Sequence, residues 1–145
     1  MKTEILLVED DRNEVDVVLR AIDRAGLRVD VSVASDGMEA LEALGLESGE
    51  TPPVSPEVVF LDLKMPRVDG FEVLRRLRAD PRTASLPVVV VSSSDRGDDI
   101  RRSYALGANS FVLKRFDPRG PGSYLAEAAR YWVGLNRRAR EGSAR

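Results

Sequence analysis

Four short apolar runs rich in β-branched residues constrain the fold of this chain more than any other feature of its sequence. The runs are Ile5–Val8, Val58–Leu61, Val88–Val91 and Phe111–Leu113. None of them alternates with polar residues, and strands of this kind are buried on both faces, as in a parallel sheet that is covered by helices. The sequence therefore predicts a layered α/β domain.

A fifth strand and five helices follow from other patterns. Val29, Val31 and Val33 alternate with polar residues, which is typical of an edge strand. Helical spacing marks Val15–Ile22, Ala40–Leu44, Phe71–Leu77, Ile100–Leu106 and a long last helix, Leu125–Leu135. Five successive strand–helix units predict a five-stranded parallel sheet with helices on both faces and right-handed crossovers. We expect the strand order 2-1-3-4-5 of the doubly wound, flavodoxin-like folds.

The length of 145 residues fits one domain, 1–145. We expect a folded core over about residues 4–136. The segment Gly45–Pro56 is rich in Gly, Ser and Pro and is predicted to be a loop inside the domain. The basic segment Arg137–Arg145 is predicted to be a frayed helix end or a disordered tail.

The composition excludes several kinds of site and partner. The chain has no Cys and no His, so disulfides, thiol or imidazole metal ligands and Ser–His catalytic pairs are excluded. Any metal must be bound by oxygen, which favours Mg²⁺, Ca²⁺ or Mn²⁺. A net charge of -2 gives no reason to expect nucleic acid or a membrane as a partner. With no signal-peptide or membrane-span pattern, we expect a cytoplasmic protein.

Polar and charged residues follow the predicted strands at the carboxyl edge of the sheet, where open α/β sheets bind ligands. They are Glu9, Asp10 and Asp11 after the first strand, Asp62 after the third, Ser92, Ser93 and Ser94 after the fourth and Lys114 after the fifth. A single Asp after a strand is more often a helix cap, and Asp11 with Glu14 fits a capping box. Several carboxylates packed together repel one another unless a cation lies between them, so the set favours Mg²⁺.

The same set fits phosphoryl transfer, which depends mostly on positioning and charge neutralisation. Asp62 is the best candidate nucleophile, because an Asp carboxylate can form a covalent aspartyl phosphate. Lys114 would supply a second positive charge, and the Ser92 hydroxyl would donate a hydrogen bond to a phosphoryl oxygen.

At this point the sequence resembles the receiver (CheY-like) domains of two-component response regulators, from Ile5 to about Leu135. The likeness rests on ILLVEDD (Ile5–Asp11), DGMEAL (Asp36–Leu41), VVFLDLKMPRVDGFEVL (Val58–Leu74), LPVVVVSSS (Leu86–Ser94) and GANSFVLKRF (Gly107–Phe116). The run Asp62-Leu63-Lys64-Met65-Pro66, followed by Asp69-Gly70, is highly specific in this context.

The resemblance implies a role for each of these positions. Asp62 would be the phosphoacceptor, and Mg²⁺ would be bound by Asp10, Asp62 and the backbone carbonyl of Lys64, with Glu9 contributing through water. Ser92 would be the switch hydroxyl, Phe111 the aromatic side chain whose rotamer follows it, and Lys114 the lysine that pairs with the phosphoryl group. Lys64 and Ser94 occupy positions that tune loss of that group in the family.

Within the family, the chain looks like single-domain receivers that partner phytochrome-type histidine kinases. That likeness rests on Asp99–Tyr104, Leu106–Asn109, the loop Gly45–Pro56 and the late aromatic pair Tyr131-Trp132. The resemblance implies that a histidine kinase donates the phosphoryl group in trans. It also implies signalling by contact with an unknown downstream protein, through the face of the fourth helix, fifth strand and fifth helix, and allows a homodimer there. Core packing explains Trp132 equally well.

One residue departs from the family pattern. The family usually has Pro after the lysine, often with a cis peptide bond, whereas this chain has Arg115. A cis bond before a residue other than Pro costs about 3–4 kcal/mol, so we expect a trans Lys114–Arg115 bond.

Three alternatives remain. A phosphohydrolase of the haloacid dehalogenase type normally needs a second Asp two residues after its nucleophile, where this chain has Lys64. A flavodoxin-like FMN carrier needs a phosphate loop rich in Gly and hydroxyls after the first strand, where Glu9–Asp11 would repel phosphate. A receiver that acts only as a constitutive docking module would keep the same residues.

Overall fold

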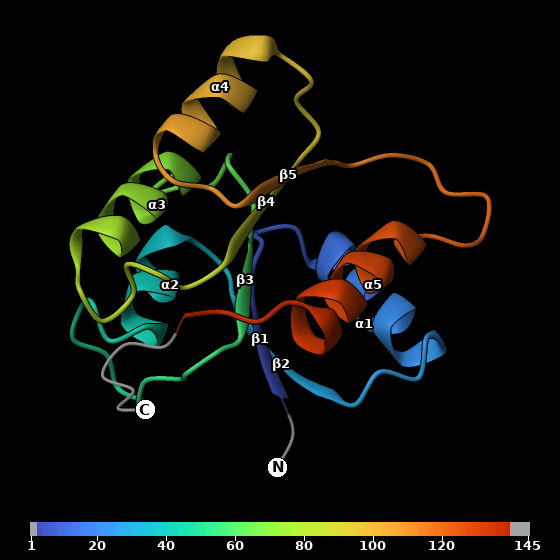
Figure 1. Cartoon of the computed structure of the whole chain (residues 1–145), viewed down its shortest axis with the longest axis horizontal. Helices are drawn as coiled ribbons and strands as arrows, with labels where there is room; N and C mark the ends of the chain where they lie inside the picture. The colour runs from blue at the N-terminus through green and yellow to red at the C-terminus, as the bar shows by residue number, and fades with distance from the viewer. Residues whose placement is uncertain (1–2, 140–145) are drawn as a thin grey trace.

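The structure, a computed structural model, describes residues 3–139 and contains the predicted parallel sheet. Its strands are β1 (Thr3–Val8), β2 (Val29–Ala34), β3 (Val58–Leu61), β4 (Val88–Ser92) and β5 (Ser110–Leu113). They pair in parallel in the order β2-β1-β3-β4-β5 (Figure 1). The predicted fold class and strand order are therefore confirmed.

Helices cover both faces of the sheet (Figure 1). They are α1 (Arg12–Arg24), α2 (Gly37–Ala43), α3 (Gly70–Ala79), α4 (Gly97–Ala105) and α5 (Ser123–Arg130). Helices α2 and α3 pack on one face, α1 and α5 pack on the other, and α4 lies beside α3 and β5. Among the helices of residues 3–139, none has the length and apolar character that a membrane span requires.

The central strands are apolar on both sides because each side faces a different core. In β1, Ile5 and Leu7 point toward α1 and α5, whereas Leu6 and Val8 point toward α2 and α3. These four side chains are at most 5% exposed. Burial of both faces explains why the apolar runs lack the alternation of a half-exposed strand.

Aspartates cap three of the helices, and the first cap differs from the prediction. Asp11 accepts hydrogen bonds from the backbone N–H of Asn13 (2.8 Å) and Glu14 (3.4 Å), as an N-cap residue does. The predicted capping box is wrong in its second half, because the N–H of Asp11 donates to Glu9 Oε2 (3.1 Å) and not to Glu14. The Glu14 carboxylate instead pairs with Lys114.

The predicted last helix is also wrong in its final turn. Helix α5 ends at Arg130, and a π-helical turn, η1 (Tyr131–Leu135), follows it. The N–H of Asn136 donates to the Tyr131 carbonyl at 2.8 Å, which is the i→i+5 bond of a π-helix. Gly134, a weak helix former, lies in this turn. Trp132 packs against the core that lies between the sheet and helices α1 and α5, in agreement with the packing interpretation of this residue.

After η1 the chain crosses back to the amino-terminal edge of the sheet (Figure 1). Arg138 Nη1 donates to the Pro56 carbonyl (3.1 Å), and Ser85 Oγ donates to the Ala139 carbonyl (3.2 Å). Residues 137–139 are therefore held against two loops, and the prediction of a frayed helix end is wrong for them. The rest of the predicted tail, 140–145, lies outside the described residues.

Candidate functional site

The carboxyl ends of four neighbouring strands place the predicted site residues at one edge of the sheet. In the strand register, Val8 of β1 lies beside Leu61 of β3, and Ser92 of β4 lies beside Leu113 of β5. The next residues along β1, β3 and β5 are Glu9, Asp62 and Lys114. Residues more than one hundred positions apart in the sequence are thereby in contact.

Three carboxylates form the acidic part of the site. Glu9 and Asp62 are buried, at 6% and 8% exposure, whereas Asp10 is exposed. One oxygen from each of the three lies within 4.8 Å of the others. Carboxylate oxygens are the ligands that Mg²⁺ and Mn²⁺ prefer, and one carboxylate open to solvent leaves room for water ligands. The donor set therefore fits a hard divalent cation.

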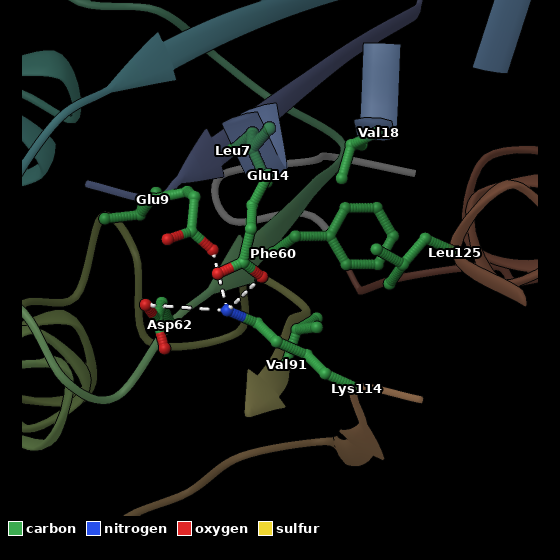
Figure 2. A pocket seen from close by; sticks show the side chains of 10 residues that line it. Leu7, Glu9, Glu14, Val18, Phe60, Asp62, Val91, Lys114 and Leu125 are labelled. Carbon is green, nitrogen blue, oxygen red and sulfur yellow. Dashed lines mark hydrogen bonds and ion pairs between the residues drawn. The ribbon is translucent and has the colours of Figure 1, made fainter. Parts of the chain in front are cut away.

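Lys114 lies at the centre of the site (Figure 2). Its Nζ atom is 2.9 Å from Glu9 Oε1 and 2.7 Å from Glu14 Oε1, but 3.8 Å from Asp62 Oδ2. The lysine side chain reaches the carboxylates past an apolar wall that includes Phe60. The ammonium group thus links the ends of β1 and β3 to the first turn of α1.

Burial and charge change the proton affinities of the three central groups. Burial, reinforced by the negative charge of Asp62, raises the pKa of Glu9 to about 7, although Lys114 and the Asp11 N–H oppose the shift. Burial also raises the pKa of Asp62, against the opposing charge of Lys114. Burial alone would lower the pKa of Lys114, but hydrogen bonds to Glu14 and Glu9 outweigh it and raise that pKa. The site therefore favours a positive charge next to Asp62.

The backbone fixes the position of Asp62 at the end of β3. Its N–H donates to the Val8 carbonyl of β1 at 3.0 Å, so the sheet ladder continues to this residue. The N–H of Lys64 approaches Asp62 Oδ1 at 3.5 Å, the long limit of a hydrogen bond. The Lys64 side chain is exposed, and a metal-binding role for its carbonyl stays a prediction.

Ser92 ends β4 and connects the site to α4. The Ser92 side chain is 2% exposed, and its hydroxyl oxygen accepts a hydrogen bond from the Ser94 N–H at 3.1 Å. Ser94 Oγ in turn donates to Asp99 Oδ2 in the first turn of α4 at 2.6 Å. A continuous set of hydrogen bonds therefore runs from the candidate switch hydroxyl into α4.

The remaining predicted residues lie along β5 and just after it. Phe111 is half-buried, and its N–H donates to the hydroxyl of Tyr104 on α4 at 3.1 Å. The Lys114–Arg115 bond is trans, as expected. The Arg115 N–H, which a proline would lack, donates to the Tyr124 hydroxyl of α5 at 3.3 Å. Arg115 therefore attaches this loop to α5.

Sequence reasoning missed the contact between Glu14 and Lys114. The capping-box pattern gave Glu14 a local role, and a short window does not identify a partner one hundred residues away. One signal was available, because Glu14 precedes Val18 by one helical turn and Val18 belongs to the predicted apolar face of its helix. This spacing indicates that Glu14 lies on the face of its helix that is turned toward the sheet.

Comparisons with known proteins agree with this arrangement. The profile of the response regulator receiver domain family matches residues 5–120. The probable methanogenesis regulatory protein FilR2 of Methanothrix harundinacea is 37% identical over 133 residues, which are 92% of this chain and 85% of that protein.

Solved structures of similar proteins give the same result. The phosphorylated cyanobacterial phytochrome response regulator RcpA is 30% identical, with a TM-score of 0.86 over 95% of this chain and 99% of RcpA. The Mn²⁺-bound response regulator Rcp1 is 25% identical, with a TM-score of 0.83 over 94% of this chain and 99% of Rcp1. The curated Rcp1 sequence, from Synechocystis, is 31% identical over 76% of this chain and 75% of that protein.

Proposed function

Since the chain belongs to the response regulator receiver domain family, we propose that it is a phosphorylation switch that accepts a phosphoryl group on Asp62 from a partner histidine kinase. The observation that carries the proposal is that Asp62, at the end of the buried strand β3, belongs to the acidic group that fits a divalent cation and also lies 3.8 Å from the ammonium of Lys114. Within residues 3–139, only Asp62 and Glu9 belong to the candidate cation group and also have an ion pair with Lys114.

The proposed reaction transfers a phosphoryl group from a histidine nitrogen of the kinase to a carboxylate oxygen of Asp62. A carboxylate oxygen of Asp62 attacks the phosphorus of a phosphohistidine on the kinase, and a new P–O bond forms as the P–N bond breaks. The electron pair of the broken bond stays on the imidazole nitrogen of the kinase, which this chain, having no His, cannot supply itself. The product is an acyl phosphate on Asp62, and the chain is a participant in the transfer rather than a turnover enzyme.

Other residues of the site would stabilise the product. Glu9, Asp10, Asp62 and the Lys64 carbonyl would hold Mg²⁺, which when bound neutralises charge on the carboxylates and the phosphoryl oxygens. Lys114 would pair with one phosphoryl oxygen, and Ser92 would donate its hydroxyl hydrogen to another. These contacts form only when the phosphoryl group is present, so they favour the phosphorylated conformation.

We further propose a phytochrome-type kinase as the partner. The support is the likeness to RcpA, a phytochrome response regulator, with nearly full coverage of both chains. The signal would leave through the face of α4, β5 and α5 to an unknown downstream protein or a second copy of this chain. The route would be the hydrogen bonds from Ser92 through Ser94 to Asp99. In this proposal the chain works as one receiver domain in the cytoplasm.

Intact-mass measurement after incubation with acetyl phosphate and Mg²⁺ tests the proposal. Wild type should gain one phosphoryl group that is lost in mild alkali, and it should gain none when Mg²⁺ is chelated. The Asp62→Asn variant should gain none under either condition. If wild type gains no phosphoryl group and binds no Mg²⁺, the switch is refuted and the chain is a docking module on a receiver fold.

A further inference from the structure

The ammonium of Lys114 is shared among carboxylates before any phosphoryl group is present. An ammonium has three protons to donate. Glu9 and Glu14 lie within hydrogen-bond distance of Nζ, at 2.9 and 2.7 Å, while Asp62 lies beyond it at 3.8 Å. The shortest ion-pair distance of Lys114 is therefore to Glu14 of α1 and not to Asp62, the proposed phosphoacceptor.

The fold holds Glu14 in this position. Val18, one turn further along α1, is buried in the core beside Phe60 and Leu125. Side chains four residues apart lie on the same face of a helix, so burial of Val18 turns Glu14 toward the sheet. Asp11 is the N-cap residue of α1 and accepts a hydrogen bond from the Glu14 N–H, which fixes where the first turn begins. Figure 2 shows the Glu14 carboxylate above the Lys114 ammonium, whereas Asp62 lies to one side of it.

Glu14 differs from the other two carboxylates around Lys114 in what it can do besides binding the lysine. Within the part of the chain that the structure describes, Glu9 and Asp62 belong to the group of acidic residues that fits a divalent cation. Glu14 does not belong to that group. The Glu14 side chain is 43% exposed, so water can solvate its charge when the lysine moves away. Glu14 can therefore release Lys114 without leaving a buried charge unpaired.

From this geometry we propose that Glu14 is a positioning residue that restrains Lys114 in the unphosphorylated protein and competes with the phosphoryl group for its ammonium. The inference deepens the proposed function and rests on it, because the competition exists only if Lys114 pairs with a phosphoryl group on Asp62. Its consequence is that Glu14 sets how tightly the site holds that group. Replacing the carboxylate should then strengthen binding of a phosphoryl group, although Glu14 touches no reacting atom.

The inference is tested by measuring the affinity for beryllofluoride, a non-covalent analogue of the phosphoryl group, with Mg²⁺ at a saturating concentration. Glu14→Gln keeps the shape of the side chain and removes its charge, and it should bind beryllofluoride roughly three- to fivefold more tightly than wild type. Asp16→Asn is the matched control, because it removes an exposed carboxylate from the same helix. Its affinity should equal that of wild type.

A double-mutant cycle with Lys114→Gln separates the lysine-mediated effect from a general change in charge. Glu14→Gln should give no gain in affinity when Lys114 is already replaced. Equal affinities of Glu14→Gln and Asp16→Asn, or the same gain in the Lys114→Gln background, would overturn the inference and leave the proposed function standing. Failure of wild type to bind beryllofluoride would overturn both.

Discussion

A Cβ atom added to Gly70 would lie 2.4 Å from the carbonyl oxygen of Asp62 and 2.7 Å from Leu63 Cα. Contacts this short between a side chain and backbone atoms do not occur in folded proteins, so one of the two segments must move if residue 70 is not Gly. The first turn of α3 thus packs directly on the backbone that holds the proposed phosphoacceptor.

Gly70→Ala should therefore lower the free energy of unfolding by about 1–3 kcal/mol, because overpacking displaces backbone that has no space to yield. Gly134→Ala is the matched control, since no atom lies within 4 Å of a Cβ added there. That control should leave stability unchanged or raise it by about 0.5–1 kcal/mol. Urea unfolding followed by circular dichroism measures both, and equal stabilities of the two variants would contradict the packing argument.

Ser94→Ala should loosen the start of α4. The N-cap residue Arg96 makes no side-chain capping bond, and the hydrogen bond from Ser94 Oγ to Asp99 connects the first turn of α4 to the loop before it. Its loss should cost about 1 kcal/mol and speed hydrogen exchange at the Ile100 amide about fivefold. Asp98→Asn, which removes an exposed partner of Arg101, should leave that exchange rate near the wild-type value. Equal exchange in the two variants would show that Ser94 does not hold the helix.

Without metal, the stability of the protein should depend on pH through Glu9. Its pKa rises from 4.5 to about 7 on folding, so its favourable contribution is complete below pH 4.5 and is lost as the pH increases to about 7. Wild type should lose stability relative to Glu9→Gln across this interval. Mg²⁺ binds the deprotonated carboxylate, so its stabilising effect on wild type should be larger at pH 8 than at pH 5.5.

Thermal unfolding of wild type and Glu9→Gln from pH 4.5 to pH 8, with and without Mg²⁺, measures both effects. Comparison of the two proteins removes the contributions of groups that titrate equally in each. A constant difference in midpoint temperature over this range, in the absence of Mg²⁺, would mean that burial of Glu9 does not raise its pKa.

The sequence predicted the sheet well because its central strands carry a local signal. Residues such as Val58–Leu61 and Val88–Val91 are apolar without alternation, and only strands buried on both faces need that pattern. The meeting of the site residues at the strand ends then followed from the parallel topology alone. Parallel strands bring Glu9, Asp62 and Lys114 to one edge wherever the intervening loops run.

Features that depend on side-chain packing could not be predicted in this way. Glu14 fits a capping box in the sequence, but Lys114 attracts its carboxylate once the fold brings the two together. The π-helical turn at Tyr131–Leu135 and the crossing of Arg138 to Pro56 also depend on contacts between distant segments. Short sequence windows do not identify the distant partner in such contacts.

The predicted roles of Ser92 and Lys64 rest on the family resemblance and not on a local sequence pattern. The structure places Ser92 at the end of β4, in a chain of hydrogen bonds that leads to α4. It gives Lys64 only a long contact between its N–H and Asp62.

Chemical trapping shows directly whether Asp62 is the residue that carries the phosphoryl group. Borohydride reduces an aspartyl phosphate to homoserine, so the protein is treated with acetyl phosphate and Mg²⁺, reduced, digested and sequenced by tandem mass spectrometry. We expect homoserine at position 62 and at no other acidic position. Homoserine at another position, such as that of Asp10, or a phosphorylated protein that yields none, would contradict it.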